Sequence, residues 1–137
     1  MDKLIIGGKH ITKSMSLNEF AVNSFREVST NNSKVYISNE PIDFVGYDFW
    51  VHLFVVEGNI QRVELYNASE QFNVDYSTMN KEIIEEQRKE DDRILNEAYG
   101  EPNVKRATGV EYNFQWGKIF SFYDNKSCEV GIVAIFN

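Results

Sequence analysis

The pattern of apolar and polar positions predicts one β-hairpin in the middle of the chain. Residues 47–56 are almost all strand formers, Glu57-Gly58-Asn59 supplies a turn, and residues 60–66 form the return strand. A three-residue loop pairs odd positions with odd and creates one apolar face, whereas a two-residue loop pairs that face with polar residues. The pattern therefore favours the three-residue loop. The apolar face then consists of Phe49, Val51, Leu53, Val55, Val63 and Leu65.

A second pattern predicts a short amphipathic helix over residues 17–27. Ser16 is suited to cap it, and Glu19, three residues later, can reach back to the backbone N–H of the cap. Apolar residues follow at helical spacing. The polar residues 29–33 then indicate a loop, and Val35-Tyr36-Ile37 indicates a short strand.

The second half begins with a longer predicted helix, over residues 77–99. This segment has no Gly or Pro and is rich in good helix formers, and Gly100 and Pro102 mark its end. Its apolar stripe is interrupted at residues 90–92, which indicates a bend or a division of the helix there. Alternating residues from Val110 to Trp116 and two further runs, 118–123 and 128–136, predict a β-meander.

The two pattern halves, residues 1–70 and 76–137, follow the same order of a helix and then strands. Strands joined by short turns are antiparallel, and two helices can cover only one face of the sheet that so many strands form. We therefore predict a single domain over residues 1–137. Its expected fold class is α+β, an antiparallel sheet with helices packed on one face, built as a tandem α-β-β-β repeat.

The segment 94–102, followed by aromatic-rich hairpins through Trp116 and Phe122, resembles a unit of the SmpA/OmlA and β-lactamase-inhibitor-protein group. That unit consists of a helix, a small Gly-x-Pro stop and a β-meander. The likeness covers much of the second half and, more loosely, residues 4–66. It implies α-then-β units in tandem and a sheet that serves as a protein-binding surface.

Composition narrows the class of protein. Of the 137 residues, 42% are hydrophobic and 14% aromatic, which excludes a disordered acidic tail. The net charge of −7 argues against nucleic acid as a partner, because phosphate binding draws on clustered Lys and Arg. No membrane span is predicted, since the longest apolar run, 49–56, is too short. The lack of a recognisable secretion signal and the lone Cys128 predict a cytoplasmic protein.

Motifs for catalysis or metal binding are missing from the sequence. The two histidines, His10 and His52, belong to no metal-binding pattern, so we expect no catalytic residues, no metal and no cofactor. Acidic residues cluster over 82–92, but bases are interspersed at three and four residues, which is typical of a solvated helix face.

The candidate site is the even-numbered face of the central hairpin. If the odd face packs under the helices, the even face points outward and presents residue types that are enriched at binding hot spots. These residues are Trp50, His52, Phe54, Arg62, Glu64 and Tyr66. The alternative is that Trp50 and Phe54 pack beneath a loop or an oligomer partner.

These observations favour a non-enzymatic, cytoplasmic protein-binding module, of the inhibitor or immunity type, whose partner is another protein and basic. The alternative is a small-ligand-binding or enzymatic domain with a pocket between sheet and helices. That pocket would be lined by Tyr47, Trp50, His52, Tyr112 and Trp116. A third hypothesis is a homo-oligomer that buries the aromatic face by symmetry.

Overall fold

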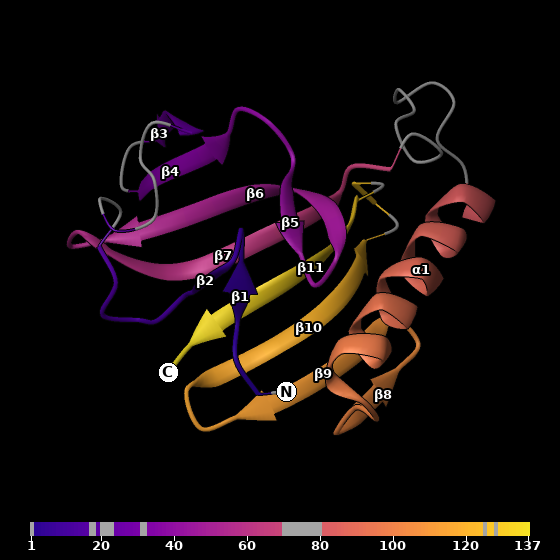
Figure 1. Cartoon of the computed structure of the whole chain (residues 1–137). Coiled ribbons are helices and arrows are strands. Elements are labelled where there is room, and N and C mark those ends of the chain that lie inside the picture. Colours follow the sequence, from indigo (N-terminus) through magenta and orange to yellow (C-terminus); the bar gives the residue numbers. More distant parts are fainter. Residues whose placement is uncertain are drawn as a thin grey trace.

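The structure is a computed structural model that describes residues 2–16, 19, 24–30, 33–69, 81–124, 126–127 and 129–137. These residues form an antiparallel sheet of eleven strands and one α-helix (Figure 1). The elements of the first half are β1 (Ile5–Ile6), β2 (Lys9–His10), β3 (Phe25–Thr30), β4 (Ser33–Ser38), β5 (Ile42–Phe44), β6 (Tyr47–Val56) and β7 (Asn59–Asn67). Those of the second half are α1 (Lys81–Tyr99), β8 (Val104–Arg106), β9 (Gly109–Phe114), β10 (Gly117–Asp124) and β11 (Glu129–Phe136).

One sheet runs through both halves of the chain. Its strand order is β2-β1-β5-β6-β7-β11-β10-β9-β8. Strand β4 pairs with the second part of β6, and β3 pairs with β4. The two halves meet where β7 pairs with β11, the last strand of the sequence. The ladder between these two strands therefore holds the halves together.

The predicted register of the central hairpin is confirmed, because Val51 pairs with Leu65 and Leu53 with Val63. The loop itself is shorter than predicted. Val56 pairs with Asn59, and the two turn residues, Glu57 and Gly58, have positive φ angles of 52° and 82°. A register shift between Phe54 and Val55 restores the odd-to-odd pairing. A bulge thus reconciles a two-residue turn with the apolar pattern.

The hydrophobic core lies on one face of the sheet. Helix α1 packs on β9, β10 and β11, and the N-terminal segment lies on the same side (Figure 1). The core joins Leu4, Ile6 and Ile11 of that segment to the odd positions of the hairpin and to Ile94 and Leu95 of the helix. We call this side the covered face.

The predicted α+β fold with helices packed on one face is wrong. The predicted helix over 17–27 ends in a strand, because residues 25–30 form β3, and residues 17, 18 and 20–23 lie outside the described residues. Pairing of Val28 with Val35 decides this, since β-branched side chains suit a strand. The described residues of the first half contain strands and no α-helix, so the tandem α-β-β-β repeat is wrong as well.

The cap predicted for that helix nevertheless forms. The backbone N–H of Ser16 donates a hydrogen bond of 2.9 Å to the Glu19 carboxylate. The predicted contact is therefore present even though the helix, as predicted, is not. Local hydrogen bonds of this kind are set by neighbouring residues, whereas the fate of residues 25–30 depends on a partner strand.

The second predicted helix is present as α1, which runs without a division through residues 90–92. It ends at Tyr99, and the next residue, Gly100, has a φ of 83° and donates its N–H to the carbonyl of Asn96. Residues 77–80 lie outside the described residues. No helix in the described part of the chain is long and apolar enough to cross a membrane.

Candidate functional site

The sheet face opposite the covered face carries the whole predicted binding set. The hairpin register places Trp50 opposite Tyr66. It also places His52 opposite Glu64, and Phe54 opposite Arg62. Opposite residues of an antiparallel pair have side chains in contact range, so the structure brings the six residues together.

Contacts within the set hold its side chains in place. Arg62 forms an ion pair of 2.7 Å with Glu64 and lies over the Phe54 ring, with 5.8 Å to the ring centroid. The Tyr66 hydroxyl donates a hydrogen bond of 2.8 Å to the other oxygen of Glu64. The His52 ring lies 4.9 Å from the Tyr66 ring. These contacts therefore hold the side chains of the set against one another.

Burial determines which side chains of the candidate set are charged. It lowers the pKa of His52, and the nearby Glu64 carboxylate only partly offsets this effect. Burial and the hydrogen bond to Glu64 raise the pKa of Tyr66 well above its usual range. At neutral pH both rings are therefore uncharged, and the charges of the set are those of the Arg62–Glu64 pair.

The surface extends well beyond the hairpin, because residues from the other strands continue it in two rows. The first row consists of Arg26, Ile37, His52, Glu64, Val133, Phe120, Glu111 and Val104. The second row consists of Val28, Val35, Phe54, Arg62, Ile135, Lys118 and Asn113. We call these rows, together with Trp50, Tyr66, Gly131 and Phe122, the open face.

Gly131 allows two aromatic rings of the open face to meet. The rings of Tyr66 and Phe122 lie edge to face with centroids 6.4 Å apart. A Cβ on Gly131 would lie 2.9 Å from the Phe122 ring and 3.1 Å from the Tyr66 ring. A larger residue would push these rings apart, so glycine permits this packing.

The open face is apolar, partly exposed and nearly neutral. Trp50 is 39% exposed and Val28 43% exposed, and none of its side chains belongs to the core of the covered face. Its charged residues are the bases Arg26, Arg62 and Lys118 and the acids Glu64 and Glu111. Because the whole chain carries −7, the acidic excess lies elsewhere on the molecule.

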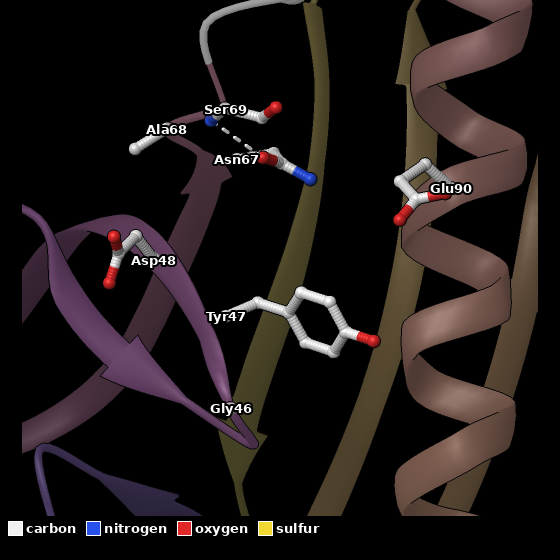
Figure 2. A pocket seen from close by; sticks show the side chains of 7 residues that line it. All are labelled: Gly46, Tyr47, Asp48, Asn67, Ala68, Ser69 and Glu90. Carbon is white, nitrogen blue, oxygen red and sulfur yellow. Dashed lines mark hydrogen bonds between the residues drawn. The ribbon is translucent and has the colours of Figure 1, made fainter.

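A cleft of about 490 Å³ opens on the other side of the sheet, between the ends of β6 and β7 and helix α1. It is lined by Gly46, Tyr47, Asp48, Asn67, Ala68, Ser69 and Glu90. Figure 2 shows Tyr47 and Asn67 pointing toward the helix and Glu90 pointing back from it. The polar groups bind one another, since the Tyr47 hydroxyl contacts Glu97 and Arg93, and Arg93 also pairs with Glu90.

The structure does not assemble the alternative ligand pocket. Of its five predicted residues, Tyr47 alone lines the cleft. Trp50 and His52 are on the open face, whereas Tyr112 lies in the core of the covered face. Trp116 stacks on Phe114, with ring centroids 5.1 Å apart. The described residues also contain no group of three or more His, Cys, Asp or Glu side chains placed to hold a metal ion.

Sequence reasoning missed a buried acid behind this cleft. Asp91 is fully buried, and its Oδ2 has no hydrogen-bond partner within the described part of the chain. Its Oδ1 accepts a hydrogen bond of 3.5 Å from the amide of Asn67, which lines the cleft. Burial raises the pKa of Asp91 to about 8. The signal in the sequence was the interruption of the apolar stripe at residues 90–92, but a solvated helix face would give the same interruption.

The neighbouring Asp92 is partnered and ties the helix to the sheet. Its carboxylate forms an ion pair of 2.9 Å with Arg88 and accepts a hydrogen bond of 2.5 Å from Ser121 on β10. Ser121 in turn accepts a hydrogen bond from the backbone of Val110 on β9. Asp92 thus has a structural role, which leaves Asp91 as the unexplained acid.

Known proteins add no information about the site beyond its own geometry. The open face is one continuous surface of a defined shape and charge, and the cleft is a smaller, internally bonded feature. The resemblance to the SmpA/OmlA and β-lactamase-inhibitor-protein group stays a prediction. No protein-family model, no curated protein and no solved structure matches this chain.

Proposed function

We propose that this protein is a protein-binding module that holds a partner protein against its open face. The observation that carries the proposal is a continuous face with exposed Trp50 and Val28, on the side of the sheet opposite the core of the covered face. Large exposed apolar surfaces on folded chains typically serve interaction, and Trp, Tyr and Arg supply most of the energy at such sites.

The rigidity of the face supports this function. Its central strands, β6, β7, β11 and β10, are paired on both sides, and the ring and ion contacts fix Arg62, Glu64 and Tyr66. Side chains that are ordered before binding lose little conformational entropy when a partner arrives. A partner that is complementary to this surface therefore binds with little ordering penalty.

The charge distribution favours a basic partner, as an inhibitor or immunity-type protein would have. The chain carries −7, while the open face is nearly neutral, so the field that surrounds the face is negative. Such a field steers a positive protein toward the molecule and raises its association rate. The apolar centre of the face then supplies the lasting contact.

The test is affinity capture on the immobilised chain from native lysate, followed by titration of the identified protein against it. We expect a partner rich in Lys and Arg, and we expect the W50A/Y66A double variant to lose at least about tenfold in affinity. The Q115A variant is the matched control, because Gln115 is exposed at the turn between β9 and β10, outside the open face. A folded double variant with unchanged affinity would refute the proposal.

A further inference from the structure

We propose that a second copy of this chain covers the open face when no partner is bound. The inference rests on the proposed function only in that both occupants use the same face. Self-association would then regulate that face, because a partner protein must compete with the second copy. The inference is argued from the area of the open face, from the charges on that face and from the net charge of the chain.

The open face has the size of a dimer interface. Its first row crosses eight strands, β3 to β8 in sheet order, and a spacing of about 4.8 Å per strand gives a width of about 34 Å. Each residue of the face takes up about 32 Å² of flat sheet, from about 4.8 Å between strands and about 6.7 Å between alternate residues. The two rows and the four further residues together give a flat area of about 600 Å², which compares with the ~800 Å² that each protomer buries in a standard stable interface.

The charges of the first row are complementary under two-fold symmetry. Arg26 lies on β3 and Glu111 on β9, at equal distances, in strands, from β7. A two-fold axis that runs along β7 therefore brings Arg26 of one copy to Glu111 of the other, and Glu111 also forms ion pairs of 3.1 Å with Arg106 and 3.9 Å with Lys118 of its own copy. The Arg62–Glu64 pair lies at this centre, where the ion pair of 2.7 Å within each copy joins the two charges.

Because of the net charge, added salt should change the stability of the dimer and that of the complex with a basic partner in opposite directions. Two copies that each carry −7 repel one another over distances that salt screens, whereas the apolar contact is insensitive to screening and an exposed ion pair such as Arg26 with Glu111 contributes little. Added salt therefore strengthens the dimer. A complex with a basic partner depends on attraction instead, and added salt weakens it.

Sedimentation velocity on the purified full chain tests the inference without any partner. Across about 1–100 μM protein we expect a reversible monomer–dimer equilibrium. Its dissociation constant should fall several-fold between about 50 mM and about 500 mM NaCl. The variants W50E and V28E each place a carboxylate on the open face, and each should weaken the dimer at least about tenfold.

The control is Q115E, which adds the same charge at the exposed turn between β9 and β10. It should dimerise like the unmodified chain, and circular dichroism should show all variants folded. A chain that stays monomeric at about 100 μM and 500 mM NaCl overturns the inference, as does equal weakening by Q115E. Partner capture is measured separately, so a monomeric chain that still captures a basic protein refutes the dimer and leaves the proposed function intact.

Discussion

Asp91 is the residue whose surroundings suit its chemistry least. A carboxylate in a buried position needs hydrogen bonds or an opposite charge, and Asp91 has one weak bond from Asn67 and two acidic neighbours, Asp92 and Glu90. Retention of the proton removes the charge and avoids most of the desolvation cost. Asp91 is therefore neutral in the folded chain at pH 7 and ionised in the unfolded chain.

This difference makes the stability of the protein fall as pH rises. The unfolded chain loses the Asp91 proton near pH 3.8 and the folded chain near pH 8. The contribution is therefore fully present below about pH 4 and is lost progressively up to about pH 8, by at most roughly 1.4 kcal/mol per pH unit. D91N removes the titrating group, so we expect the variant to gain stability relative to the natural chain over this interval.

Urea unfolding of both proteins between pH 4 and pH 8.5 measures the effect. E86Q is the matched control, because Glu86 is an exposed carboxylate on the same helix. It should change the pH dependence little. Parallel stability profiles for D91N and the natural chain would show that Asp91 is ionised in the fold.

The sequence could not reveal this acid. The interruption at residues 90–92 contains Glu90, Asp91 and Asp92 in succession, and nothing local says which of them lies against the sheet. The answer comes from Asn67 and Ser121, which belong to strands far away in the sequence. The placement of the six candidate residues of the hairpin on one face was predictable, because alternation assigns each one to a face.

At the scale of elements, the β6–β7 hairpin carries local strain in its turn. Glu57 has a φ of 52°, a conformation that non-glycine side chains adopt with a penalty of about 1–2 kcal/mol. Asn tolerates this conformation best among the residues with side chains, and Asn-Gly is the preferred pair for such a two-residue turn.

We therefore expect E57N to stabilise the fold by roughly 0.5–1 kcal/mol, because it relieves strain without loss of a buried contact. Thermal unfolding followed by circular dichroism measures the change. The N59D variant, at the exposed residue after the turn, serves as the control. No gain for E57N would mean that the side chain of Glu57 makes a compensating contact.

Elements whose pattern is local were predicted well, and those decided by a distant partner were not. Helix α1 and the β6–β7 and β9–β10 hairpins follow from their own residues. Residues 25–30 combine a plausible helical spacing with β-branched residues, and pairing with β4 resolves the conflict in favour of a strand. The bulge that shortens the hairpin loop is likewise invisible to a rule based on loop length alone.

At the scale of the molecule, the sheet makes each half depend on the other. Strand β7 pairs with β11, and one core contains Leu65 of the first half and Ile119 and Ile132 of the second. A fragment of residues 76–137 would expose the β11 edge and leave its apolar residues without their partners.

We expect this fragment, expressed alone, to lack a cooperative thermal transition, and we expect the full chain to unfold in one transition. Differential scanning calorimetry of both proteins measures this directly. Independent folding of the fragment would contradict a shared core and would support a division of the chain near residue 70.

The part of the open face that lies on the hairpin could be foreseen, and the part on the other strands could not. The hairpin contributes Trp50, His52 and Phe54 from a pattern visible in the sequence, whereas Phe120 and Val133 join them only through the long-range order of strands. Such order depends on which edges meet during folding, and no local rule encodes it.

The two tryptophans give the molecule a natural pair of optical probes. Trp50 lies on the open face and is 39% exposed, whereas Trp116 is stacked on Phe114 and donates a hydrogen bond to the carbonyl of Asp2. Their indole rings therefore lie in different surroundings. Emission from Trp50 responds to whatever covers the open face, and emission from Trp116 responds to the integrity of the packing beside the N-terminal segment. Tryptophan fluorescence can thus distinguish occupation of the open face from unfolding of the chain, and no added label is needed.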